Sequence, residues 1–77
     1  MRNRKKLTAA EKSFILFHMG KEDEDKTALW MIIARATPDE RKKLWWTFPE
    51  ETAVYERLAD DDGYFDRLLK LHRKENA

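Results

Sequence analysis

The chain has 77 residues, enough to enclose one hydrophobic core and too few for a second. It contains no cysteine, which excludes disulfides, thiolate zinc sites and iron–sulfur clusters. Charged residues make up 40% of the chain and hydrophobic residues 42%, and the latter include three tryptophans and four phenylalanines. So many large apolar side chains favour a folded core over disorder.

The net charge of +1 is unevenly distributed along the chain. Residues 1–6 carry four positive charges and no negative ones, whereas residues 50–62 carry six acids and one arginine. We therefore expect a basic N-terminal arm at residues 1–7 and a single helical domain at 8–77. The apolar run at 27–34 is far too short to span a membrane, and no signal-peptide pattern follows the first basic residues. We expect a cytoplasmic protein with no membrane contact.

Hydrophobic spacing and helix-boundary signals predict an all-α fold of four to five short helices, arranged as a bundle or an orthogonal array. The five predicted helices lie at about residues 9–19, 26–36, 38–46, 49–59 and 63–74. Three of them have clear start signals: Thr8 ahead of Glu11, Thr37 ahead of Pro38, and Phe48 ahead of Pro49. A strand is the competing interpretation for residues 29–33, but the surrounding alanines favour helix.

Aspartates should cap the other two helices: Asp23 or Asp25 the second, and one of residues 60–62 the last. Gly20 is a natural stop for the first helix. We expect the core to be built from large apolar residues of all five helices: Phe14, Phe17, Leu29, Trp30, Ile33, Leu44, Trp45, Val54, Leu58, Phe65, Leu68 and Leu69.

Catalytic and metal-binding patterns are weak. His18 and His72 lack the spacing of a metal-binding helix pair, and Ser13 does not lie in a nucleophile elbow. The run from Asp60 to Gly63 fails the calcium-loop pattern, because the twelfth position would be Leu69 instead of glutamate. We therefore expect a protein that is not an enzyme and has no cofactor, metal ion or small-molecule substrate.

The surplus of apolar residues points to binding. Residues 14–17 are large and apolar around a full helical turn, and residues 28–34 are apolar nearly all round, more than one small core can enclose. We expect a protein–protein surface containing at least one of four large residues: Ile15, Met19, Trp46 and Tyr55. Acids can add an electrostatic contact to it: Glu50, Glu51, Asp60, Asp61 and Asp62.

The leading hypothesis is a small regulator, inhibitor or adaptor that binds a larger protein or forms a homodimer, in a size range common among phage and mobile-element proteins. The alternative is a DNA-binding helix-turn-helix regulator that uses the basic arm and the third helix. Its contacts would come from seven basic residues: Arg2, Arg4, Lys5, Lys6, Arg41, Lys42 and Lys43. The near-zero net charge and the acids Asp39 and Glu40 at the start of that helix argue against it.

Overall fold

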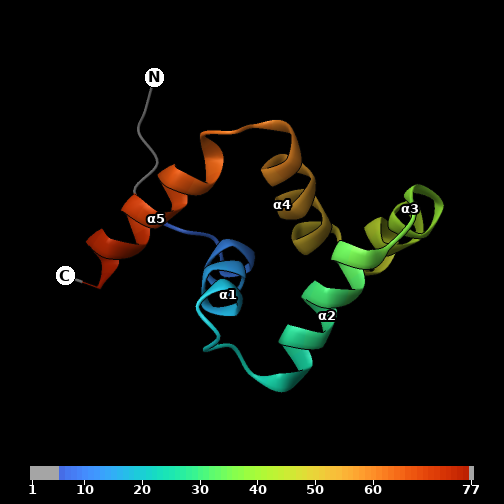
Figure 1. The fold of residues 1–77 in the computed structure, drawn as a ribbon, viewed down its shortest axis with the longest axis horizontal. Helices are drawn as coiled ribbons and strands as arrows, with labels where there is room; N and C mark the ends of the chain where they lie inside the picture. Colours follow the sequence, from blue (N-terminus) through green and yellow to red (C-terminus); the bar gives the residue numbers. More distant parts are fainter. Residues whose placement is uncertain (1–5, 77) are drawn as a thin grey trace.

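The computed structural model describes residues 6–76, which form five α-helices and no strand. The helices are α1 (Ala9–His18), α2 (Glu24–Arg35), α3 (Pro38–Thr47), α4 (Pro49–Asp60) and α5 (Tyr64–Glu75) (Figure 1). The predicted all-α class is confirmed, and each predicted helix end lies within two residues of the observed one. Most of the predicted arm, residues 1–5, lies outside the described residues.

Local capping fixes the helix starts. The Thr8 hydroxyl accepts a hydrogen bond from the Glu11 amide at 3.1 Å, and the Glu11 carboxylate accepts one from the Thr8 amide at 2.9 Å. The same reciprocal pair forms between Thr37 and Glu40 at the start of α3. Asp23 caps α2 with its side chain. These contacts satisfy helix amides that would otherwise lack a partner.

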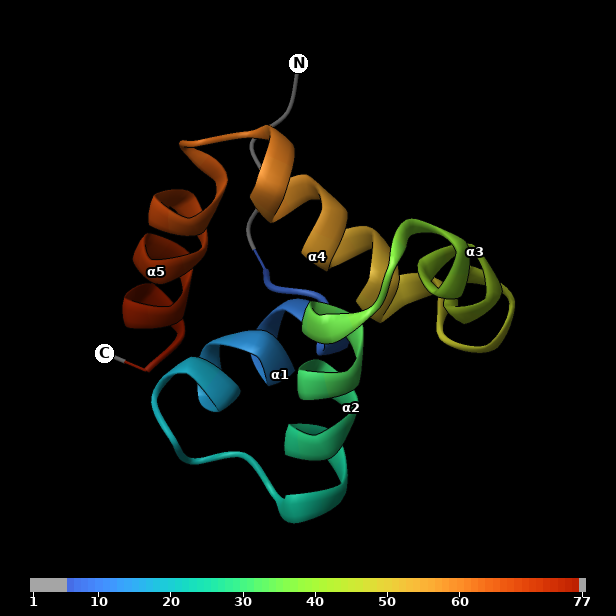
Figure 2. The same ribbon diagram turned by 45° about the vertical axis from the view of Figure 1, so that its right-hand side comes forward.

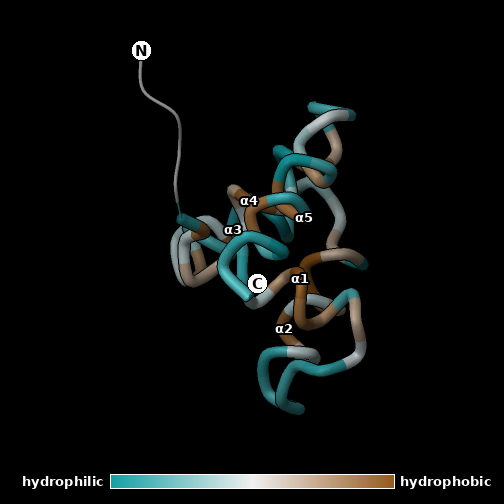
Figure 3. Tube along the Cα trace, turned by 90° about the vertical axis from the view of Figure 1, so that its left-hand side faces the viewer, coloured by the Kyte–Doolittle hydropathy of each residue, from teal (hydrophilic) through white to brown (hydrophobic). Residues whose placement is uncertain are grey.

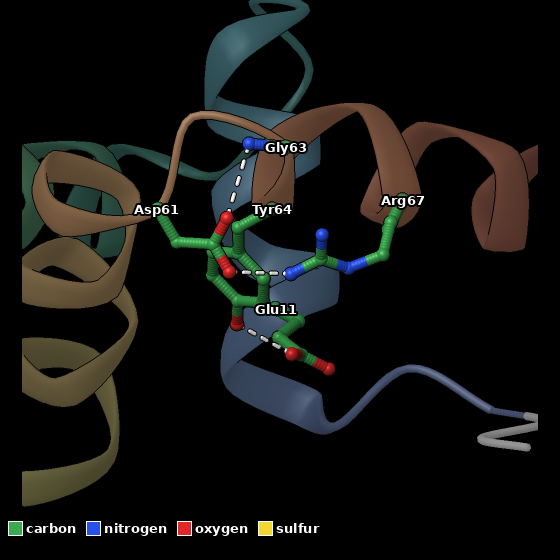
Figure 4. A network of polar contacts seen from close by, with 5 residues as sticks. All are labelled: Glu11, Asp61, Gly63, Tyr64 and Arg67. Atoms are coloured by element: carbon green, nitrogen blue, oxygen red, sulfur yellow. Dashed lines mark hydrogen bonds and ion pairs between the residues drawn. The ribbon is translucent and has the colours of Figure 1, made fainter.

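The start of α5 differs from the prediction. Its N-cap is Gly63, which provides no side-chain hydrogen bond, so the expected aspartate cap is wrong. Asp61 instead accepts from the Gly63 amide at 3.1 Å and from the Arg67 guanidinium at 2.5 Å (Figure 4). The hydrogen bond from Arg67 is the main reason why the pKa of Asp61 lies below its usual value.

The helices form a thin slab of 37 × 31 × 19 Å. α1 packs against α2, α4 and α5, whereas α3 packs mainly on α4. Figures 1 and 2 place α3 and α5 at opposite ends of the molecule. A helix with its side chains is about 10–12 Å across, so a slab this thin encloses few residues on every side.

Six side chains are almost completely buried: Ile15, Trp30, Ile33, Thr52, Tyr64 and Leu68. Figure 3 shows hydrophobic residues along much of α1, the helix around which the core forms. The other predicted core residues are buried or half-buried, except Trp45, which is 39% exposed. That prediction is wrong because Leu44 occupies the position that packs against the core.

Polar contacts stabilise the core from inside. The Trp30 indole Nε1 donates to Ser13 Oγ at 2.9 Å, and both residues are buried. The Tyr64 hydroxyl donates to Glu11 Oε2 at 2.5 Å, which joins the first turns of α5 and α1 (Figure 4). The Arg57 guanidinium lies 4.5 Å from the centre of the Tyr64 ring. Buried polar groups with partners avoid most of the desolvation penalty.

Candidate functional site

The helix α3 has no buried residue, although it carries two of the three tryptophans. Leu44 packs against the core, and Trp46 follows two positions later, at about 200° around the helix axis. The Trp46 side chain therefore faces outward and is 90% exposed. An indole that remains in water is a large apolar area with no contact inside this domain.

Arg41 attaches α3 to the rest of the domain. Its Nη2 donates to the Ala36 carbonyl oxygen at 3.0 Å, and its guanidinium lies 5.1 Å from the centre of the Tyr55 ring on α4. A guanidinium engaged in this way has a structural role. Arg41 is half-buried, whereas Lys42 and Lys43 beside it are exposed.

An open groove of about 440 Å³ lies between α2 and α3. Its apolar part comes from Ile32, which is 56% exposed, together with Ala36 and Leu44. Its polar lining is Arg35, Glu40, Lys43 and Thr47. Trp46 lies one helical turn beyond Lys43. We call the groove and Trp46 together the α2–α3 surface.

The four apolar residues predicted for a binding surface have different positions. Ile15 is 0% exposed, so its inclusion is wrong: α1 lies against three other helices, which cover it. Tyr55 is half-buried beneath Arg41. Met19 is the exposed C-cap of α1, a helix that Figures 1 and 2 show apart from α3. Trp46 alone among the four belongs to the α2–α3 surface.

Sequence reasoning missed Ile32 and Leu44 as groove residues. Residues 28–34 are apolar on all sides of the helix, whereas only Trp30 and Ile33 occupy its buried face. This pattern could have indicated that another apolar residue of α2 is exposed. Which exposed residue would lie near α3 depends on how the two helices meet. That arrangement is tertiary and leaves no local pattern in the sequence.

The predicted acidic residues do not form one patch. Glu50 and Glu51 lie in the first turn of α4 and Asp60 at its end, and a 12-residue helix is about 18 Å long. Asp61 is engaged by Arg67 and Gly63, whereas Asp62 is exposed. The acids therefore lie at two separate places.

The basic residues of the DNA-binding alternative are also divided. Lys42 and Lys43 lie on α3, at one end of the molecule. Lys6 is exposed, and the adjacent Leu7 amide donates to Glu75 Oε2 at 2.7 Å, at the end of α5. Arg2, Arg4 and Lys5 lie outside the described residues. The arm thus joins the domain at the opposite end from α3 (Figures 1 and 2).

A second hollow, of about 310 Å³, is mainly aromatic and lies between α1, α4 and α5. His18 lines it, with its ring centre 4.8 Å from that of Phe65 in an edge-on arrangement. Within residues 6–76 no group of three or more histidine, aspartate or glutamate side chains is placed to hold a metal ion. None of the described helices has the length and apolar character needed to cross a membrane.

Comparison with known proteins found no matching family model, no matching curated protein and no matching solved structure. The α2–α3 surface contains the two most exposed large apolar side chains of residues 6–76, Trp46 and Ile32.

Proposed function

We propose that this protein is a non-enzymatic binding module, a small regulator, inhibitor or adaptor, that docks on a larger protein through the α2–α3 surface. The observation that carries the proposal is the 90% exposure of Trp46, one helical turn from Lys43, which lines a partly apolar groove. Tryptophan is among the residues that contribute most binding energy at protein interfaces, because it buries a large area with few rotors.

The groove also suggests the kind of partner. Its floor is apolar, and its rim carries Arg35 and Lys43 against the single acid Glu40. An amphipathic helix with apolar residues facing the groove and acids at its flanks would match both features. The partner we infer is a protein that presents such a helix.

Trp46→Glu tests this proposal. Because the side chain is almost fully exposed, we expect the free energy of unfolding to change by no more than about 0.5 kcal/mol. Bound partner should be lost, since a charge would replace the most exposed apolar side chain of the α2–α3 surface. Affinity capture with the intact chain, followed by mass spectrometry and titration of the captured protein, measures the effect, and circular dichroism checks the fold.

Met19→Glu is the matched control, because it places the same charge on an exposed apolar residue that follows α1 and does not line the groove. It should leave binding unchanged. A partner captured equally by wild type and Trp46→Glu would contradict the proposal. A dimer detected by light scattering that Trp46→Glu dissociates would make a second copy of this chain the partner.

The DNA-binding alternative has less support. A helix-turn-helix reader would need the arm and α3 to approach the same duplex, yet the arm joins the domain beside α5. Asp39 and Glu40 occupy the first turn of α3, where a recognition helix approaches the bases. Of the basic residues proposed for α3, only Lys42 and Lys43 are exposed, because Arg41 is half-buried.

A further inference from the structure

Two distant parts of the chain meet at the last turn of α5. The Leu7 amide donates to Glu75 Oε2 at 2.7 Å across a separation of 68 residues. Lys6 is exposed directly before this contact. The contact therefore brings Lys6 to the end of α5.

The outer face of α5 is strongly charged. Tyr64 and Leu68 face the core, and the exposed residues of this helix are Asp66, Arg67, Lys70, Arg73, Lys74 and Glu75. Arg67 is held by Asp61, and the Glu75 carboxylate accepts from Leu7. Lys70, Arg73 and Lys74 lie within about one helical turn of one another and make no ion pair in the described structure.

This arrangement concentrates the positive charge of the molecule. Among the described residues, 6–7 and 64–76 together hold five lysines and arginines and two acids, a net charge of +3. Residues 8–63 carry a net charge of −5. The described part of the chain thus has a basic end, formed by Lys6 and the exposed face of α5.

We propose that this basic end, formed by Lys6, Lys70, Arg73 and Lys74, binds the phosphate backbone of duplex nucleic acid without reading its sequence. Lysine ammonium groups and arginine guanidinium groups are the side chains that contact phosphates, and the release of condensed counterions drives such binding. This inference is independent of the α2–α3 surface.

Other anionic partners fit the surface less well. A helix that lies on an anionic membrane inserts an exposed apolar face, whereas α5 uses its apolar face for the core. Single strands bind where aromatic side chains stack on bases, and the exposed tryptophans lie on α3 at the opposite end. A purely charged surface is suited to the phosphates of a duplex.

The test compares two matched charge reversals in the full chain, K70E/K74E on α5 and K42E/K43E on α3. All four lysines are exposed, so both variants should fold, which circular dichroism and thermal melting check. Binding to a short labelled DNA duplex of mixed sequence is followed by fluorescence anisotropy over a range of salt concentrations. Vesicles of anionic phospholipid and a single strand of the same sequence serve as competitors.

We expect wild-type affinity to fall linearly with salt on logarithmic axes, and K70E/K74E to weaken binding at low salt by about tenfold or more. The slope should become shallower by about two, because two phosphate contacts are lost. K42E/K43E should change affinity by less than about twofold. If K70E/K74E has a lower melting temperature than wild type, K70Q/K74Q replaces it in the comparison with K42E/K43E, because it removes the charges without reversing them.

Four results would overturn the inference. They are no duplex binding by wild type at low salt, equal weakening by both charge reversals, weakening by K42E/K43E alone, and effective competition by vesicles or single strands. Equal weakening would show an effect of net charge, and weakening by K42E/K43E alone would place the nucleic acid on α3.

Discussion

Trp30 is almost fully enclosed even though its indole carries a polar N–H. Its partner is Ser13 on α1, at a separation of 17 residues. The sequence shows a lone serine with no catalytic context but does not show that it faces an indole, because the contact depends on how α1 meets α2. Burial of Trp30 was predictable from hydrophobicity, whereas its hydrogen-bond acceptor was not.

We predict that Ser13→Ala lowers the free energy of unfolding by about 1–3 kcal/mol, because a buried indole N–H would lose its acceptor. Urea denaturation measures the change. In a Trp30→Phe background, which has no N–H to satisfy, the same substitution should cost less. An equal cost in both backgrounds would show that the hydrogen bond is not the cause.

The residues around Ile15 show why the sequence did not reveal which position of α1 is most deeply buried. Residues 14–17 are all large and apolar, so the sequence contains no polar face that tells which side of the helix is innermost. In the structure Ile15 is fully enclosed and Phe14 and Phe17 are half-buried. Trp45 was misplaced for the same reason, since Trp45 and Trp46 are adjacent and equally apolar.

At the scale of helices, the sequence was informative because capping is local. The reciprocal contacts of Thr8 and Thr37 involve residues three positions apart, so each helix start can be recognised without knowing the fold. How firmly each helix is held was not predictable. α1 lies against three helices, whereas α3 packs mainly on α4 and has no buried residue.

We predict that Thr37→Ala destabilises α3 locally by roughly 0.5–2 kcal/mol, because the helix would lose its N-cap hydrogen bond. Amide hydrogen exchange should show faster exchange in α3 and unchanged protection in α1, because a weakly attached helix opens on its own. Thr8→Ala is the matched control: α1 is central, so its loss of cap should lower protection throughout the domain. Equal losses of protection in both helices with Thr37→Ala would contradict the local opening.

For the whole molecule, the uneven charge along the chain was evident from the sequence, but the position of Lys6 beside the basic face of α5 was not. That arrangement depends on the contact between Leu7 and Glu75, which no local pattern indicates. The groove between α2 and α3 was likewise unpredictable, because it exists only where two helices meet. The fold thus places an apolar surface at one end and a basic surface at the other.

We predict that the two surfaces act independently, because α3 and α5 lie at opposite ends. Trp46→Glu should leave duplex affinity unchanged, and K70E/K74E should leave binding to the protein partner unchanged. In the triple variant W46E/K70E/K74E, the change in binding free energy in each assay should equal the sum of the changes in the two separate variants within about 0.3–0.5 kcal/mol. A larger deviation would mean that the ends are coupled through the core.

The three tryptophans also make the molecule an optical reporter of its own surfaces. Trp30 is 1% exposed, Trp45 39% and Trp46 90%, so their fluorescence arises in dry, mixed and aqueous environments. A soluble quencher therefore reaches Trp46 more readily than the other two tryptophans. A protein that covers the α2–α3 surface would shield Trp46 and shift the emission to shorter wavelength, whereas a duplex at the basic end would leave that signal unchanged. Occupancy of the α2–α3 surface can therefore be followed without attaching a dye to this chain.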